Sequence, residues 1–247
     1  MHPVLTSRYD ARRPLVAGAL LSFCCLVLLC GCGKEEDWTP QAAAGTAPTD
    51  PEVMLVVNGA EIRRDEIEAS VGYFSRVYPE QDTEAIVRFA LNEDLIPLAA
   101  VRAHYSKILT AKRAEIDNML AGMAESKDTL RTASKQFRFA DSLFREIKEA
   151  WYTPDKFKHS TQGIAAFDTP KGELSEPFIT SGGIHVLQVI DRTTLGDLSQ
   201  QSAKLYQVIA RFDTVENLTR TIPQVRAETR VTWVHPDYEN YVSISLR

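Results

Sequence analysis

The sequence predicts an α+β fold, and three observations support this prediction. Near residue 53, an apolar run of strand length leads into Asn58-Gly59, a residue pair typical of the tight turn in a β-hairpin. Apolar residues then recur every three or four positions over much of residues 67–123, the spacing of helices with one buried face. A strand pattern returns near the end of the chain, over residues 229–234. A mainly helical fold, with strands near both ends of the folded part, is therefore expected.

The composition argues against several classes of function. The chain has 247 residues, 44% of them hydrophobic, which is enough for one good core or two small domains. Its net charge of −5 argues against nucleic-acid binding, which usually needs a basic surface. No spacing of His, Asp or Glu resembles a zinc site, and the sequence has neither a phosphate-binding loop nor a nucleophile elbow. We therefore expect no nucleic-acid partner, no metal and no cofactor.

Residues 1–31 are predicted to be a signal peptide rather than part of the fold. An arginine-rich start precedes an apolar stretch, residues 14–29, which is slightly short for a membrane helix. The stretch ends in Leu29-Cys30-Gly31-Cys32, which resembles the lipobox of bacterial lipoproteins. The resemblance implies cleavage before Cys32 and attachment of lipid to it, so the chain would contact the membrane through a lipid anchor. An uncleaved membrane anchor is the alternative.

Residues 32–52 are predicted to be a flexible tether behind the lipid. The stretch is polar at first and then rich in Ala, Thr, Pro and Gly, a composition that cannot bury a core. The other cysteines leave with the signal peptide, so the mature chain has no disulfide and no thiolate nucleophile. Gly33 does not look like an inner-membrane retention signal. We expect the periplasmic face of the outer membrane, with the cell surface or the inner membrane as alternatives.

The folded part begins near residue 52 with the predicted hairpin. Its strands cover Val53–Val57 and the residues around Ile62, and Asp65 is expected to cap the helix that follows. A second helix is expected to start after Asp82 or Thr83 and to kink or end at Pro97. A third apolar stripe runs over residues 101–123. Core packing is the preferred interpretation of all these stripes.

Two stretches resemble known families. Residues 56–67, Val-Val-Asn-Gly-Ala-Glu-Ile-Arg-Arg-Asp-Glu-Ile, look like the opening of SurA-type periplasmic chaperones. Residues 172–180, Gly-Glu-Leu-Ser-Glu-Pro-Phe-Ile-Thr, and 183–189, Gly-Ile-His-Val-Leu-Gln-Val, resemble the C-terminal third of a parvulin-type (PpiC) prolyl isomerase. Together these resemblances cover residues 53–125 and roughly residues 160–194.

The resemblance implies three parts in the folded chain. Residues 53–127 would form a SurA-like N-terminal chaperone domain, and residues 128–195 a reduced, degenerate parvulin-like α/β insertion. Residues 196–247 would return to the chaperone domain as a helix and a strand. The apolar spacing predicts that the helix covers residues 205–222, and the resemblance implies that the strand pairs beside the hairpin.

The resemblance also implies the position of a site. A parvulin holds the proline ring in an apolar and aromatic cup, above paired histidines and a Cys or Asp, and it needs no cofactor. His185 matches one histidine and Phe167 part of the cup, so both are candidate catalytic residues. Ile184 and Phe178 are expected to bind substrate. His159 could substitute for a missing histidine.

Departures from the family leave the activity open. The family's second histidine lies on its first strand, but the corresponding residues 135–139 contain none. Apolar residues recur here at helical spacing, which predicts a helix in place of the family's strand and leaves open whether residues 135–139 are strand or helix: Phe137, Ala140, Phe144, Ile147 and Trp151. We expect either a prolyl isomerase that assists the folding of exported proteins or a non-catalytic holdase that grips unfolded or partly folded chains. An envelope scaffold with one dedicated partner is a further alternative.

Overall fold

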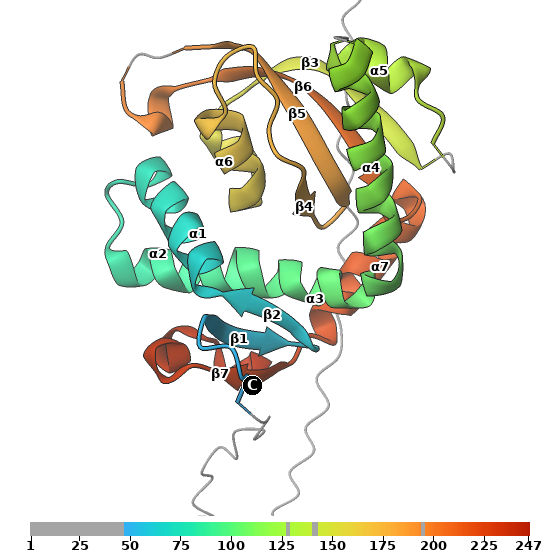
Figure 1. Cartoon of the computed structure of the whole chain (residues 1–247). Coiled ribbons are helices and arrows are strands. Elements are labelled where there is room, and N and C mark those ends of the chain that lie inside the picture. Colours follow the sequence, from blue (N-terminus) through green and yellow to red (C-terminus); the bar gives the residue numbers. More distant parts are fainter. Residues whose placement is uncertain (1–46, 127–128, 140–142, 194–195) are drawn as a thin grey trace, which may run out of the picture. The chain divides into compact units, whose positions relative to one another are not determined.

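The computed structural model describes residues 47–126, 129–139, 143–193 and 196–247. The predicted signal peptide, Cys32 and most of the predicted tether lie outside these residues. Seven α-helices and two antiparallel sheets occur in the described part of the chain (Figure 1), which confirms the predicted α+β class.

The smaller sheet joins segments from both ends of the described chain. β1 (Val53–Val57) lies between β2 (Ala60–Arg63) and β7 (Val231–Val234) and is antiparallel to both. In the turn between β1 and β2, Asn58 and Gly59 have φ angles of 49° and 87°, the left-handed region that these two residues tolerate best. The structure thus confirms the predicted hairpin and the third strand beside it.

Helix α1 (Arg64–Val77) follows β2 without a loop. Its N-cap residue is Arg63, so the prediction that Asp65 caps the helix was wrong. Asp65 lies inside the first turn instead, where a negative charge favours the positive end of the helix dipole. Glu66 accepts a hydrogen bond from the Arg63 N–H at 2.9 Å and so satisfies a donor at the helix start. The predicted apolar face is largely buried, with these residues in the core: Ile67, Phe74 and Val77.

The next helical stretch changes its hydrogen-bonding pattern along its length. α2 (Thr83–Phe89) begins as predicted, capped by the side chain of Asp82. The chain continues through a π-helical segment (Ala90–Leu95) into α3 (Ile96–His104). Pro97 lies in the first turn of α3, where a missing N–H is tolerated, so it marks a new helical segment rather than the end of the helical path.

Helices α4 (Ser106–Ser126) and α5 (Leu130–Gln136) lead to the larger sheet. Its first strand, β3 (Phe144–Tyr152), occupies much of a segment for which we predicted helix, so that prediction was wrong. β3 is an edge strand, and its pairing with β6 is irregular between Ile147 and Ala150. The bulge interrupts the two-residue alternation of side chains, which explains the four-residue spacing of Ile147 and Trp151.

The larger sheet has the strand order β3-β6-β5-β4, and every neighbouring pair is antiparallel. β4 (Phe178–Thr180) and β5 (Gly183–Arg192) form a hairpin, and β6 (Ala203–Arg211) is a central strand. The helix predicted over residues 205–222 therefore starts only at α7 (Val215–Ala227). β6 is buried on both faces, so its apolar residues do not alternate with polar ones, and their spacing imitates a helix.

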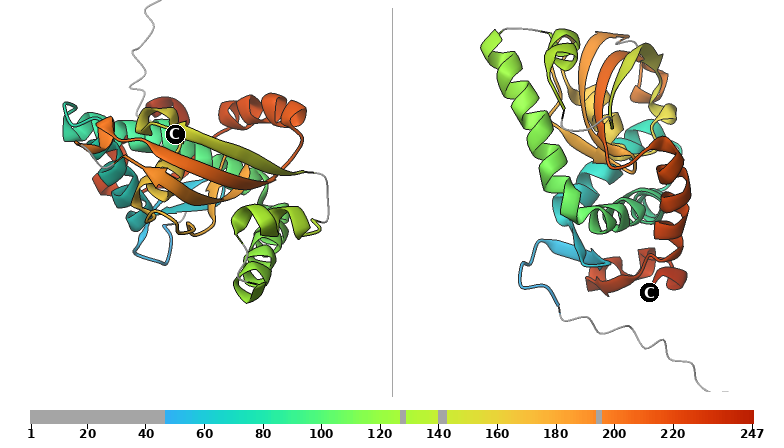
Figure 2. Two further views of the ribbon diagram at one scale, coloured as in Figure 1. Left: turned by 90° about the horizontal axis from the view of Figure 1, so that it is seen from above. Right: turned by 90° about the vertical axis from the view of Figure 1, so that its right-hand side faces the viewer.

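Helices cover both faces of this sheet (Figure 2). α4 and α5 contact one face, and α6 (Ser160–Asp168) contacts the other. Alternate side chains of β5 and β6 divide accordingly between two cores. Ile184 and Val208 belong to the core that includes α4, whereas Leu187 and Leu205 pack with residues of α6 and α1.

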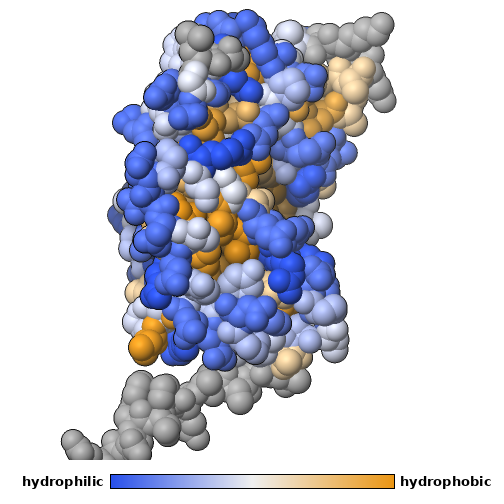
Figure 3. Space-filling model, turned by 90° about the vertical axis from the view of Figure 1, so that its left-hand side faces the viewer, coloured by the Kyte–Doolittle hydropathy of each residue, from blue (hydrophilic) through white to orange (hydrophobic). Residues whose placement is uncertain are grey.

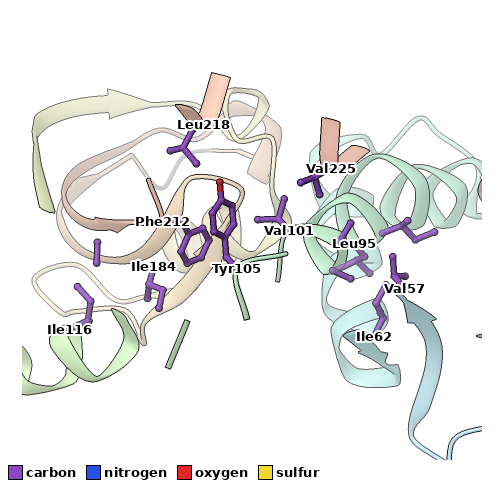
Figure 4. Close-up of a cluster of buried hydrophobic side chains, with 14 of the residues drawn as sticks. Val57, Ile62, Leu95, Val101, Tyr105, Ile116, Ile184, Phe212, Leu218 and Val225 are labelled. Atoms are coloured by element: carbon purple, nitrogen blue, oxygen red, sulfur yellow. The ribbon is translucent and has the colours of Figure 1, made fainter. Parts of the chain in front are cut away.

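One core cluster reaches both sheets (Figure 4). It begins with Val57 and Ile62 of the small hairpin and extends to Ile184 of β5. Between them, the rings of Tyr105 and Phe212 stack with centroids 4.9 Å apart. The two sheets therefore share buried apolar contacts along one continuous path.

Short 3₁₀ segments complete the fold: Pro154–Lys156, Leu198–Gln200, Pro236–Tyr241 and Ile244–Leu246. Among the described residues, no helix combines the length and apolar character needed to span a bilayer.

Candidate functional site

His185 is a buried residue of β5, on the sheet face that α6 covers. Its side chain is 5% exposed, and its Nε2 lies 2.8 Å from Thr180 Oγ1. Phe178, its partner on β4, stacks its ring on the imidazole with centroids 5.3 Å apart. The predicted candidates His185 and Phe178 are therefore in contact.

The surroundings of His185 keep its imidazole neutral. Burial lowers the pKa of His185 to about 3, and the nearby His159 and Arg211 act in the same direction. Gln207, on the same sheet face of β6, favours the charged form and opposes this shift of the pKa. Nδ1 of His185 is buried and makes no hydrogen bond within the described residues. At pH 7 this group is thus a neutral hydrogen-bonding ring rather than a cation.

A second histidine reaches the same turn from a different element. His159 immediately precedes α6 and is 5% exposed. Its Nδ1 lies 3.0 Å from Asp94 Oδ1, and its Nε2 lies 3.1 Å from the hydroxyl of Ser181. Ser181 follows Thr180, the partner of His185, in the turn between β4 and β5. Two adjacent residues, Thr180 at the end of β4 and Ser181 in the turn, therefore bind the two histidines.

Asp94 is a wholly buried carboxyl group that sequence reasoning missed. It lies in the π-helical segment, and its Oδ2 accepts hydrogen bonds from Ser70 Oγ (3.1 Å), from the Ser160 N–H (3.0 Å) and from the Ser160 hydroxyl. One signal was available in the sequence. Asp94 follows Leu91 by three positions and precedes Leu95, so a helical path puts its charge on the buried face. A charge at such a position indicates a partner or a function.

An apolar cavity of about 420 Å³ opens beside α6. Ile164 and Ala165 of α6 line one part of it, and Pro177 and Phe178 line another. Because Phe178 also stacks on His185, its ring separates the cavity from the buried imidazole. Cavities of this size are typical of small-molecule and side-chain binding sites. On the face turned toward the viewer in Figure 3, apolar residues are exposed in hollows between hydrophilic ones.

Close packing of α6 against α1 fixes the position of the site. A Cβ atom on Gly163 would lie 2.1 Å from Cζ of Tyr73, so only glycine allows this approach of the two helices. The Tyr73 hydroxyl donates a hydrogen bond to the Pro154 carbonyl oxygen at 3.1 Å. At the surface, Arg76 forms a bidentate ion pair with Asp168 at 3.0 and 3.1 Å.

The other predicted site residues lie elsewhere. Phe167 is buried on α6 and lines a different cavity, of about 500 Å³, beside Arg76 and Leu198. Ile184 is 1% exposed and packs in the core cluster shown in Figure 4. His185, the next residue of β5, points to the opposite face of the sheet. Ile184, which the sequence predicted to bind substrate, thus lies away from the cavity beside α6.

Comparison with known proteins leaves the family open. No protein-family model, curated protein or solved structure matches this chain. Within the described ranges, no group of three or more His, Cys, Asp or Glu side chains could hold a metal ion. Asp94 and His159 bond to each other and to serines, so hydrogen bonds hold this polar cluster together.

Proposed function

We propose that this chain is a lipid-anchored prolyl isomerase and chaperone of the bacterial envelope, which binds unfolded or partly folded exported polypeptides. One observation carries the proposal. Phe178 lines the apolar cavity and stacks on His185 behind it, and His159, bonded to Asp94, reaches Ser181 in the turn after β4. An apolar and aromatic cup, paired histidines and an acidic group are the parts that the parvulin resemblance implies.

The chemistry of prolyl isomerisation suits such a cavity. The barrier of about 20 kcal/mol arises from partial double-bond character, which makes the planar amide more dipolar than the twisted one. An apolar cavity that holds the proline ring therefore favours the twisted amide relative to water. A neutral His185 behind Phe178 preserves this environment, because it adds no charge beneath the ring. No cofactor is needed for this step.

A second candidate function is a holdase without isomerase activity. Gln207, rather than another histidine, lies beside His185 on the neighbouring strand. Both histidines are 5% exposed, so a bound polypeptide would meet Phe178 and the cavity walls before either imidazole. A scaffold with one dedicated partner would use the same surface, and a single stable partner in place of many transient ones would distinguish it.

Isomerisation of a short Ala-Pro peptide tests the enzyme directly. Without a catalyst, cis–trans exchange takes tens of seconds or longer at about 25 °C. The chain beginning at Gly33 should accelerate this exchange. Phe178→Ala should reduce the catalysed rate about tenfold or more, because it removes the cavity wall over His185. Exchange rates would be measured by NMR, and peptide binding by titration.

The matched control is Trp151→Ala, which removes a large, 51% exposed apolar side chain from the edge strand β3. This variant should isomerise the peptide at the wild-type rate. Peptide binding without any acceleration would refute the isomerase and leave the holdase. A chain that neither binds nor isomerises the peptide would contradict both.

The lipid anchor is tested separately at Cys32. Cys32→Ser should move the protein from the membrane fraction to the soluble fraction, because the serine cannot receive the thioether-linked lipid. Cys30→Ser, two residues earlier in the same motif, should remain in the membrane. Fractionation followed by immunoblotting measures both. Membrane retention of Cys32→Ser after a high-salt wash would favour an uncleaved anchor.

A further inference from the structure

Ser181 is the outer member of a hydrogen-bonded chain that begins in the core. The Asp94 carboxylate lies 3.0 Å from Nδ1 of His159, and Nε2 of the same ring lies 3.1 Å from the Ser181 hydroxyl. Ser181 is partly exposed in the turn between β4 and β5, whereas Asp94 is fully buried. An acid, an imidazole and a hydroxyl are thus connected in the order that activates a serine nucleophile.

The partners of Asp94 determine which nitrogen of His159 carries the proton. Oδ2 of Asp94 already accepts from Ser70 and twice from Ser160, so Oδ1 remains for the imidazole. A carboxylate oxygen can only accept, and therefore Nδ1 of His159 is the donor. Nε2 then carries the lone pair, and it faces the Ser181 hydroxyl and, at 3.3 Å, the Ser181 N–H. In this tautomer the ring is oriented to remove a proton from the hydroxyl.

The location of the acid supports a functional interpretation. Asp94 lies in a π-helical segment, a distortion that occurs frequently at functional sites. Its cluster unites α1, the π-helical segment, the start of α6 and the β4–β5 turn. Buried polar clusters of this kind are costly unless they are fully bonded, and apolar packing would join the same elements without that cost.

We propose that Ser181 is a nucleophile that accepts the acyl group of activated esters. Its Oγ attacks the carbonyl carbon, while its proton passes to Nε2 of His159 and then to the departing alcohol oxygen. The ester C–O bond breaks, and the acyl group stays on Ser181. Water then attacks the acyl carbon by the same route, which releases a carboxylic acid and restores the serine. This activity is independent of prolyl isomerisation, which forms no covalent bond.

The N–H donors around Ser181 determine how fast we expect acyl transfer to be. The N–H of Gly182, next to Ser181, donates to Thr180 Oγ1 at 3.2 Å, so it does not stabilise the oxyanion of the intermediate. Loss of one such donor costs about 10²–10³-fold in rate in serine hydrolases. We therefore expect stoichiometric modification of Ser181 with slow turnover.

A fluorophosphonate probe on the full chain tests the proposal, with the adduct assigned by peptide mass mapping. We expect one adduct per chain, at Ser181, and none at that position in Ser181→Ala. His159→Gln should slow labelling about 100-fold or more, because it removes the base. Ser243→Ala, at an exposed serine whose hydroxyl pairs with Ser245, should label like the wild type.

A cysteine variant keeps the test decisive if His159→Gln fails to fold. In Ser181→Cys, the imidazole should activate the thiol, and iodoacetamide should modify it at least about tenfold faster than the thiol of Ser243→Cys. Equal rates at the two positions, no fluorophosphonate adduct, or an adduct only at another serine would each overturn the proposal. None of these results would change the isomerase measurement.

Discussion

Replacing Asp94 with alanine should lower the free energy of unfolding by about 3–5 kcal/mol, the largest loss that we expect from a single substitution in this chain. The carboxyl group is 0% exposed and accepts hydrogen bonds from three residues: Ser70, His159 and Ser160. Alanine leaves these donors buried without a partner, and each unsatisfied group costs about 1–3 kcal/mol. Urea unfolding monitored by circular dichroism measures the difference.

The matched control is Asp117→Ala, which removes a carboxyl group of the same size from a surface pair. Asp117 lies on α4 and bonds Arg113 four residues earlier, with both side chains nearly half exposed. Such pairs contribute about 0.3–0.5 kcal/mol, so this variant should unfold almost like the wild type. If Asp94→Ala lost no more stability than Asp117→Ala, the hydrogen bonds of the buried Asp94 would not stabilise the fold, contrary to this prediction.

The parts of the fold that local chemistry determines were predictable from the sequence. Asn58-Gly59 predicted the hairpin, since few other residue pairs adopt the left-handed turn. Asp82 marked the start of α2 because its side chain satisfies a free N–H of the first turn. β7 was predicted correctly from its alternation together with the family resemblance.

The larger sheet was harder to predict because its strands break the usual alternation. β6 is covered by helices on both faces, and β3 carries a bulge at the sheet edge. Both features produce three- and four-residue spacings of apolar residues, which single-sequence reasoning interprets as helix. Tertiary contacts determine that these two segments are strands, and a local sequence pattern does not contain those contacts.

The candidate site, too, was only partly predictable from local sequence patterns. His185 and Phe178 were found through a motif in one continuous stretch, and the structure brings them into contact. Asp94 and His159 are 65 residues apart and meet only because the start of α6 lies against Asp94 in the π-helical segment. No pattern within either stretch predicts that contact. Ile184 lies on the opposite face of the sheet from His185, since neighbouring residues of a strand point to opposite faces.

Acidification should destabilise the folded chain through His185. Burial lowers the pKa of this imidazole to about 3 in the folded state, from 6.5 for an ordinary histidine. Above pH 6.5 the ring is neutral in both states, and the group has no effect on the pH dependence. Between these two values the unfolded chain binds a proton that the folded chain does not. The free energy of unfolding therefore falls as the pH falls, by about 1.4 kcal/mol per pH unit, or about 3 kcal/mol at pH 4.5.

His185→Gln should remove this part of the pH dependence, because glutamine does not titrate. Its free energy of unfolding, measured by urea at pH 7.5 and pH 4.5, should change by about 2–3 kcal/mol less than that of the wild type. Carboxyl groups titrate in both chains, so their contribution to the pH dependence cancels when the variant is compared with the wild type. His104→Gln, at an exposed histidine of α3, should retain the wild-type change. An unchanged pH dependence in His185→Gln would mean that the folded chain accommodates a charged His185, which contradicts the burial of this ring behind Phe178 as the cause of its lowered pKa.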